Sequence, residues 1–176
     1  TLIPAIARSC NGYYYRLGLK MKVEGMINMI ESFEFDKRTC IDTPNEKVSQ
    51  TPKSWKPIVE KREGRWSDIR TVFASIGQDT VVVTPISLIR AVGAIGNFGQ
   101  MHTPHFLKEF RPIAATEHFE ARPGFGFAYT EPKVIELKPD QQKMIATGMW
   151  TSVHGGGTGG IVNIPGFDVG SKTGTA

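Results

Sequence analysis

The chain has 176 residues, of which 40% are hydrophobic and 22% charged, and its 21 basic and 17 acidic residues give a formal net charge of +4. These values are ordinary for a globular protein and predict one domain, or part of one. The basic residues form no long block, which argues against nucleic-acid binding, and no apolar run approaches the roughly 18 residues that span a bilayer.

The first residues do not resemble a leader peptide, so we expect any membrane anchor or export signal to lie outside this chain. Residues 2–17 carry apolar side chains at partly helical spacing, interrupted by the polar run from Ser9 to Gly12. On a regular helix Ser9 and Asn11 would project about 200° apart, so they serve one ligand only where the backbone departs from helix, as Gly12 allows. The alternative is an ordinary pair of helix-capping side chains.

The next segments are predicted to form a core helix and a long loop. Residues 23–35 repeat apolar side chains at helical spacing, which predicts an amphipathic helix with its apolar stripe in the core. Prolines and crowded charges break any period in residues 36–66, so we expect a surface excursion that is functional or mobile. Cys10 and Cys40 belong to no spacing motif, which favours two separate thiols over a disulfide.

The second half of the chain has clearer start and stop signals. Thr84-Pro85 is a favoured helix start, and the glycines and asparagine of residues 96–99 are expected to end that helix. Residues 105–110 and 134–137 predict short strands, and a further helix is expected from Pro139 to about Val153. The glycine-rich residues 155–160 predict a flexible connection.

The last ten residues, 167–176, are predicted to form an edge-like strand that binds an anion. Lys172 supplies a positive charge, Thr173 and Thr175 supply hydroxyl donors, and Gly174 lets a ligand approach the backbone closely. Such a strand is a binding surface more than a core element.

Several other motifs carry little weight. Residues 154–157 resemble the oxyanion turn of lipase-type hydrolases, but the chain has no Gly-x-Ser-x-Gly elbow. Residues 166–173 nearly match a phosphate-binding loop, but a serine replaces the glycine before the lysine. The four histidines show no metal-ligand spacing beyond a chance His-x-x-His, so we expect neither a metal nor a cofactor. These histidines are His102, His105, His118 and His154.

The most specific signal is a pair of motifs at opposite ends of the chain, Ser9-Cys10-Asn11 and Lys172-Thr173-Gly174. Ser-x-Asn and Lys-Thr-Gly are two of the three signatures of the penicillin-recognising serine acyltransferases. Over nearly its whole length the chain resembles the elongation-type, class B penicillin-binding proteins, of the penicillin-binding protein 2 kind. The pieces that carry this resemblance also include Tyr13 to Tyr15, Ile41-Asp42, Pro44, Glu46, Trp55-Lys56, Ser75 to Gln78, Val83 to Ile86, Asn97, Gly99, Pro104-His105 and Gly148-Met149.

The resemblance implies an α+β, serine β-lactamase/transpeptidase-like fold, an antiparallel sheet flanked by helices. It implies acyl transfer from peptidoglycan stem peptides that end in D-Ala-D-Ala. Ser9 would relay a proton to the leaving amine, Asn11 would hold the substrate amide, and Lys172 would support Ser9. Thr173, Gly174 and Thr175 would bind the terminal carboxylate, and the Thr175 N–H would supply an oxyanion donor.

Two kinds of departure from the family pattern stand out. No Ser-x-x-Lys occurs in the 176 residues, so the nucleophile motif is absent. We therefore expect residues 1–176 to be part of a transpeptidase domain, incomplete at both ends, that neither acylates alone nor folds well alone. Asp79, Ser171 and Cys40 stand where the family favours glycine or another small residue, which affects tight turns.

Three alternatives remain open: a non-catalytic scaffold module of the same fold, a β-lactam-hydrolysing or sensing relative, and, more distantly, a phosphate-binding protein. The expected partners are the peptidoglycan stem peptide, β-lactam antibiotics and other cell-elongation proteins, but not nucleic acid. A membrane would be met only through a segment that this chain does not contain. The expected location is the periplasmic or extracytoplasmic face of the cell membrane.

Overall fold

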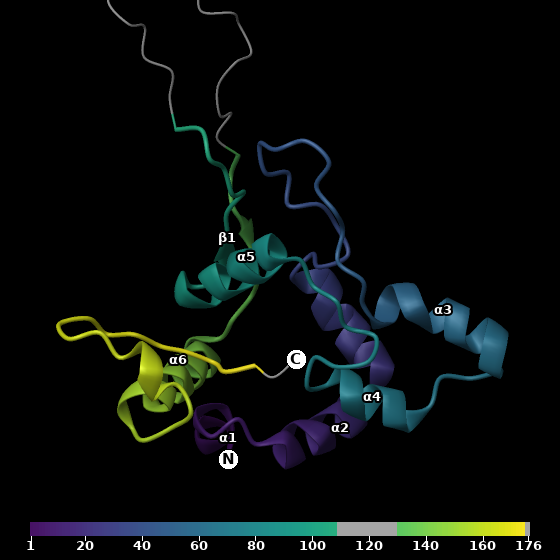
Figure 1. Ribbon diagram of the computed structural model, residues 1–176, viewed down its shortest axis with the longest axis horizontal. Coiled ribbons are helices and arrows are strands. Elements are labelled where there is room, and N and C mark those ends of the chain that lie inside the picture. The colour runs from purple at the N-terminus through teal and green to yellow at the C-terminus, as the bar shows by residue number, and fades with distance from the viewer. Residues whose placement is uncertain (109–129, 175–176) are drawn as a thin grey trace, which may run out of the picture.

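The computed structural model describes residues 1–108 and 130–174, which form helices and one short pair of antiparallel strands (Figure 1). This arrangement agrees with the predicted α+β class. Among the described residues, no helix has both the length and the apolarity of a membrane-spanning segment. The elements are α1 (Leu2–Ala7), α2 (Asn11–Ser32), α3 (Pro52–Glu63), α4 (Asp68–Ala74), α5 (Pro85–Gly96), β1 (Gln100–Met101), β2 (Lys133–Val134), α6 (Pro139–His154) and the short 3-10 helix η1 (Gly160–Val162).

A tight turn at Ser9 separates α1 from α2. The Ser9 N–H donates to the Ile6 carbonyl at 3.2 Å, and the Cys10 N–H donates to the Ala5 carbonyl at 3.0 Å. Ser9 itself has φ of +50°. This is the Schellman arrangement, which ends helices with a left-handed residue that is usually glycine. The departure from helix that the sequence required therefore lies at Ser9, and Gly12, predicted to allow it, lies inside α2.

Helix α2 is longer than predicted and bends at Lys22, which has φ of +59°. The predicted burial of its apolar stripe is only partial, because Met26, Ile27 and Ile30 are half-buried and Met29 is exposed, while Phe33, just after the helix, packs against the core. Met26, Met29 and Ile30 line a cavity of about 430 Å³ between α2, α4 and α5, and Met29 is 50% exposed. The stripe faces unfilled space here, so helical spacing identified the face correctly but not what covers it.

Residues 36–66 are not a structureless excursion, because they contain α3. Helix α3 begins with Thr51-Pro52, the same kind of start as Thr84-Pro85, and the Thr51 N–H donates to the Ser54 hydroxyl at 3.1 Å. The signal was missed because Pro57 inside the helix interrupts the apolar period.

The loop before α3 is held by two carboxylates. Glu46 accepts hydrogen bonds from the Thr39 N–H and hydroxyl, both at 2.7 Å, and from the Cys40 N–H at 3.0 Å. Asp42 accepts from the backbone N–H groups of Phe106 and Leu107, both at 2.8 Å. These bonds order a loop that has no regular secondary structure over residues 37–49.

Helix α5 matches its prediction, with the Thr84 hydroxyl accepting from the Ser87 N–H at 3.3 Å and the helix ending at Gly96. Strand β2 overlaps the predicted strand 134–137 at Val134. The strand predicted over residues 105–110 is wrong for 105–108. There the backbone N–H groups of Phe106 and Leu107 donate to the Asp42 carboxylate instead of to a neighbouring strand. Residues 109 and 110 lie outside the described part.

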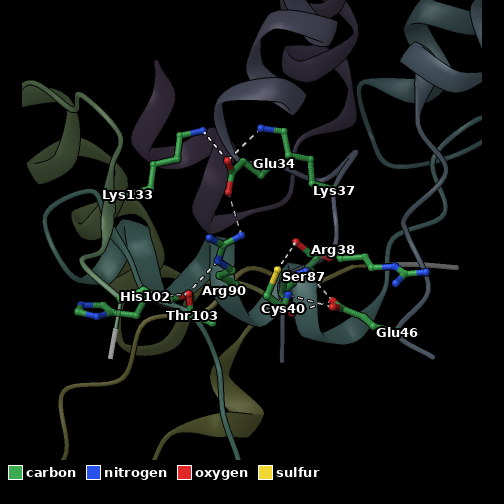
Figure 2. A network of polar contacts seen from close by, with 12 residues as sticks. Glu34, Lys37, Arg38, Cys40, Glu46, Ser87, Arg90, His102, Thr103 and Lys133 are labelled. Atoms are coloured by element: carbon green, nitrogen blue, oxygen red, sulfur yellow. Dashed lines mark hydrogen bonds and ion pairs between the residues drawn. The ribbon is translucent and has the colours of Figure 1, made fainter. Parts of the chain in front are cut away.

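A four-residue charge network joins the turn that follows α2 to α5 and β2. Figure 2 shows that the Glu34 carboxylate forms ion pairs with Lys37 and Lys133, both at 3.2 Å, and with Arg90 at 3.1 Å. Burial alone would raise the pKa of Glu34, but the hydrogen bonds from Lys133 and Lys37 and the nearby charges outweigh it and lower that pKa. The network fixes the end of α2 against α5, whose apolar face lines the candidate site described next.

Helix α6 begins at Pro139 as predicted, extends to His154 and packs against α1. The packing is close because Gly148 has no side chain, and a Cβ there would lie 2.9 Å from the Ile6 side chain. The predicted terminal strand is wrong for residues 167–174, which pair with no strand. The segment instead follows α6, with the Ser171 N–H donating to the Met149 carbonyl at 3.0 Å.

Candidate functional site

The two end motifs meet at a single hydrogen bond. The Lys172 Nζ donates to the Ser9 Oγ at 2.7 Å, although the two residues are 163 positions apart in the sequence. Figure 1 shows how this comes about, since the C-terminal segment (yellow) runs back from α6 toward the middle of the molecule, near the junction of α1 and α2. The structure thus places the Ser-x-Asn and Lys-Thr-Gly motifs in one site.

Ser9 is held in an unusual conformation for a serine. Its left-handed φ costs a non-glycine residue about 1–2 kcal/mol, and such positions are enriched at functional sites. The turn directs the hydroxyl toward Lys172 and leaves Asn11 at the first position of α2. A regular helix through residues 9–11 would have directed the Ser9 and Asn11 side chains about 200° apart.

Lys172 lies between polar and aromatic neighbours. Its Nζ also donates to the Thr173 carbonyl and lies 6.0 Å from the centre of the Tyr14 ring, which suits a weak cation–π contact. Partial burial lowers the pKa of Lys172, because removal from water disfavours the charged form. No carboxylate among the described residues forms an ion pair with Lys172.

The motifs line a cavity of about 590 Å³. Every predicted site residue that the structure describes lies on its wall, whereas Thr175 lies outside the described residues. The apolar part of the wall comes largely from α5 and α6. The lining residues are Ile6, Ser9, Asn11, Tyr14, Ser75, Ile76, Leu88, Val92, Ile95, Ile145, Met149, Lys172, Thr173 and Gly174.

The loop between α6 and η1 supports the C-terminal wall, a role that the sequence did not indicate. Thr158 contacts the Thr173 hydroxyl at 2.8 Å, and its N–H donates to the Ala7 carbonyl at 3.0 Å. A Cβ on Gly157 would lie 2.6 Å from the Ser152 Cα, so this glycine permits a close backbone approach. The loop was predicted as a flexible connection, but these contacts hold it in place.

His154 has a structural setting rather than an oxyanion-turn geometry. Its ring stacks on Trp150 with centroids 4.8 Å apart, and its Nε2 accepts from the Val169 N–H at 3.4 Å. Within residues 1–108 and 130–174, no three histidine, cysteine or acidic side chains gather as metal ligands would. Cys10 and Cys40 are free thiols, as favoured from the sequence, and His118 lies outside the described residues.

The arrangement suits binding of an acyl compound that ends in a carboxylate. Lys172, Thr173, Ser9 and Asn11 all line the cavity, and the Lys172 ammonium lies directly beside the Ser9 hydroxyl. A cation and a hydroxyl bind a carboxylate well, and a serine bonded to an ammonium can transfer a proton.

A model of the penicillin-binding protein transpeptidase domain matches residues 1–176. The chain belongs to this family. Among curated relatives, the peptidoglycan D,D-transpeptidase MrdA of Acinetobacter baumannii is 28% identical over 174 residues, which cover 98% of this chain and 24% of that protein.

Solved structures of the family share the fold. Pseudomonas aeruginosa PBP2, solved in complex with WCK 5153, is 26% identical with a TM-score of 0.72 over 90% of this chain and 34% of that one. Helicobacter pylori PBP2, solved in complex with MreC, is 25% identical with a TM-score of 0.60 over 83% of this chain and 24% of that one. The chain thus spans about a quarter of the length of the A. baumannii and H. pylori proteins.

Proposed function

We propose that residues 1–176 form part of the transpeptidase domain of a peptidoglycan D,D-transpeptidase, which cross-links stem peptides that end in D-Ala-D-Ala. The observation that carries this proposal is the 2.7 Å hydrogen bond between Lys172 and Ser9, which brings two motifs of the family to one cavity. Membership of the family supports the reaction type.

In the proposed reaction, a serine that these residues do not supply attacks the carbonyl carbon of the penultimate D-Ala. The peptide C–N bond breaks, and the leaving D-Ala nitrogen takes a proton through the Ser9 hydroxyl. An amine of a neighbouring stem peptide then attacks the acyl ester, forms a new peptide bond and returns the proton to the serine oxygen. Lys172, bonded to Ser9, keeps the hydroxyl oriented for this transfer.

Residues of both end motifs recognise the substrate in this proposal. Asn11 holds the substrate amide, while Lys172 and the Thr173 hydroxyl bind the terminal carboxylate. Gly174 leaves the backbone accessible to an extended peptide. Thr175, outside the described residues, is proposed to add a second hydroxyl and an oxyanion N–H. β-Lactams present the same carboxylate and carbonyl, so we propose that they bind here too.

The proposed setting follows from the substrate. Peptidoglycan is cross-linked outside the cytoplasmic membrane, so we place this domain at the periplasmic or extracytoplasmic face. The H. pylori PBP2–MreC complex supports a partner among cell-elongation proteins.

The decisive experiment labels the full-length protein that carries this sequence with a fluorescent penicillin and measures D-Ala release from a pentapeptide substrate. We expect label that unlabelled penicillin competes away, together with D-Ala release. Ser9→Ala and Lys172→Ala variants should lose about 10²-fold or more in acylation rate. Label without D-Ala release would favour a sensing or scaffold role, rapid turnover of penicillin would favour a hydrolase, and no label would contradict the proposal.

A further inference from the structure

We propose that Thr158 is a positioning residue that prepares the Thr173 hydroxyl to bind the substrate carboxylate. This inference rests on the proposed function and concerns a residue that neither end motif contains. It follows from how hydroxyl protons distribute among three oxygens, which are those of the Thr158 hydroxyl, the Thr173 hydroxyl and the Ala7 carbonyl.

Thr158 contacts both the Thr173 hydroxyl and the end of helix α1. Its Oγ1 lies 2.8 Å from the Thr173 Oγ1 and 3.4 Å from the Ala7 carbonyl oxygen, and its backbone N–H donates to that carbonyl at 3.0 Å. Ala7 is two residues before Ser9 and ends α1. Thr158 therefore connects the turn that holds Ser9 to the segment that holds Lys172.

The surrounding loop keeps Thr158 in this place. The N–H of Gly159 donates to the Ser152 carbonyl at 2.9 Å, and Ser152 is fully buried on α6. On the other side of Thr158, a side chain on Gly157 would collide with the Ala7 carbonyl and the Ser152 backbone. Thr158 is thus fixed by glycines on both sides that allow the backbone to press against α1 and α6.

The proton count gives Thr158 its role. A carbonyl only accepts, and each threonine hydroxyl has one proton to donate. If Thr158 donates to Ala7, its bond with Thr173 must use the Thr173 proton, which leaves none for a ligand. If Thr158 donates to Thr173, the Thr173 proton is free to bind a carboxylate, which can only accept.

The second arrangement is favoured when a carboxylate is bound. The Ala7 carbonyl already receives the Thr158 N–H at 3.0 Å, and its contact with the hydroxyl is the longer one at 3.4 Å. A hydroxyl that accepts one hydrogen bond also becomes a stronger donor in the next. Thr158 therefore orients the Thr173 proton toward the cavity and strengthens its bond to a carboxylate.

The test uses the full-length protein and two ligands, benzylpenicillin and its methyl ester, which lacks the free carboxylate. For Thr158→Val, which keeps the backbone bond to Ala7, we expect the dissociation constant of the initial benzylpenicillin complex to rise about five- to tenfold. The limiting acylation rate should stay unchanged, and the methyl ester should react equally with both proteins. Thr158→Ser, which keeps the hydroxyl, should restore tight benzylpenicillin binding.

Thr130→Val is the matched control, because the Thr130 and Thr103 hydroxyls lie 2.9 Å apart and neither residue lines the cavity. An equal loss with both ligands, or no loss with benzylpenicillin, would overturn the inference while the proposed function stands. Failure of the wild-type protein to acylate with either ligand would overturn the proposed function and the inference together. If Thr158→Val does not fold, the ligand comparison is made with Thr158→Ala.

Discussion

Several non-glycine residues among those described have a left-handed backbone conformation. Cys40 and Asp79, where the family resemblance led us to expect glycine, have φ of +62° and +59°, as Ser9 has +50°. Local hydrogen bonds accompany each substitution. The Cys40 N–H donates to Glu46, and the Asp79 carboxylate accepts from Arg70 at 3.2 Å. The turns therefore keep the glycine-type geometry at a cost of about 1–2 kcal/mol for each residue.

The lowered pKa of Lys172 makes a prediction about pH. Because the pKa lies below its ordinary value of 10.5, Lys172 loses its charge at a lower pH than an exposed lysine. If the cation binds the carboxylate, acylation by benzylpenicillin should fall as pH rises through that pKa, with the midpoint below 10.5. Lys172→Arg should be slower, by about tenfold or more, but should not show this basic limb, since a guanidinium stays charged.

The measurement is the second-order acylation rate of the full-length protein across the basic pH range. Lys143→Arg, an exposed position on α6 outside the cavity, serves as the control and should keep the wild-type profile. A basic limb that persists unchanged in Lys172→Arg would show that another group titrates.

Among the elements, the loop after α6 depends on small residues, and Gly159 offers the sharpest test. A Cβ on Gly159 would overlap the Ser171 hydroxyl and lie 2.8 Å from the Ser152 hydroxyl. Gly159→Ala should therefore lower the free energy of unfolding by about 1–3 kcal/mol. In a Ser171→Ala background the first overlap disappears, so the same change should cost about 1 kcal/mol less. Urea unfolding of the four proteins in this double-mutant cycle measures the difference.

Gly160→Ala is the control for this cycle, because a Cβ there would meet its nearest atom, the Val153 carbonyl oxygen, at an ordinary 3.9 Å. Its effect should stay within about 0.5 kcal/mol. Equal costs of Gly159→Ala with and without the Ser171 hydroxyl would contradict the packing argument. The cycle also explains how Ser171 fits where the family favours a smaller residue.

The elements that the sequence predicted well begin with local signals. Helices α5 and α6 each start with a proline in the first turn, and such signals act within a few residues. Helix α3 was missed for a local reason, Pro57, whereas two other predictions failed because they depend on distant partners. The terminal segment contains strand-like residues, but its Ser171 N–H bonds to Met149 of α6 instead of to another strand. In residues 105–108, the Phe106 N–H bonds to the Asp42 carboxylate. No local pattern encodes these contacts.

For the molecule as a whole, the candidate site was predicted through its two motifs but not through its supporting residues. Ser9 and Lys172 carry functional groups that are recognisable by type and spacing, and the structure places them 2.7 Å apart. Thr158 was missed because its role comes from position alone, in a loop whose glycines suggested flexibility. Roles of this kind become visible only when the chain is folded.

Because residues 1–176 contain no Ser-x-x-Lys, we expect that this chain alone cannot be acylated. The 176-residue chain, produced alone and incubated with a fluorescent penicillin, should stay unlabelled after denaturing electrophoresis. Large apolar side chains on α5 are also exposed, with Leu88 at 47% and Ile89 at 66%. The thermal unfolding of the isolated 176-residue chain should therefore be weakly cooperative. The full-length protein is the positive control. Covalent label on the isolated chain would contradict the missing-nucleophile argument.

The 163-residue separation of Ser9 from Lys172 has a consequence for biosynthesis. At common bacterial elongation speeds, a ribosome needs about 8 to 33 s to travel from one codon to the other. Throughout that interval the nascent polypeptide contains Ser9 but not Lys172, so the proposed binding site cannot form before the last codons are translated. A premature stop codon anywhere in between would release a product that lacks Lys172 and therefore its hydrogen bond to Ser9.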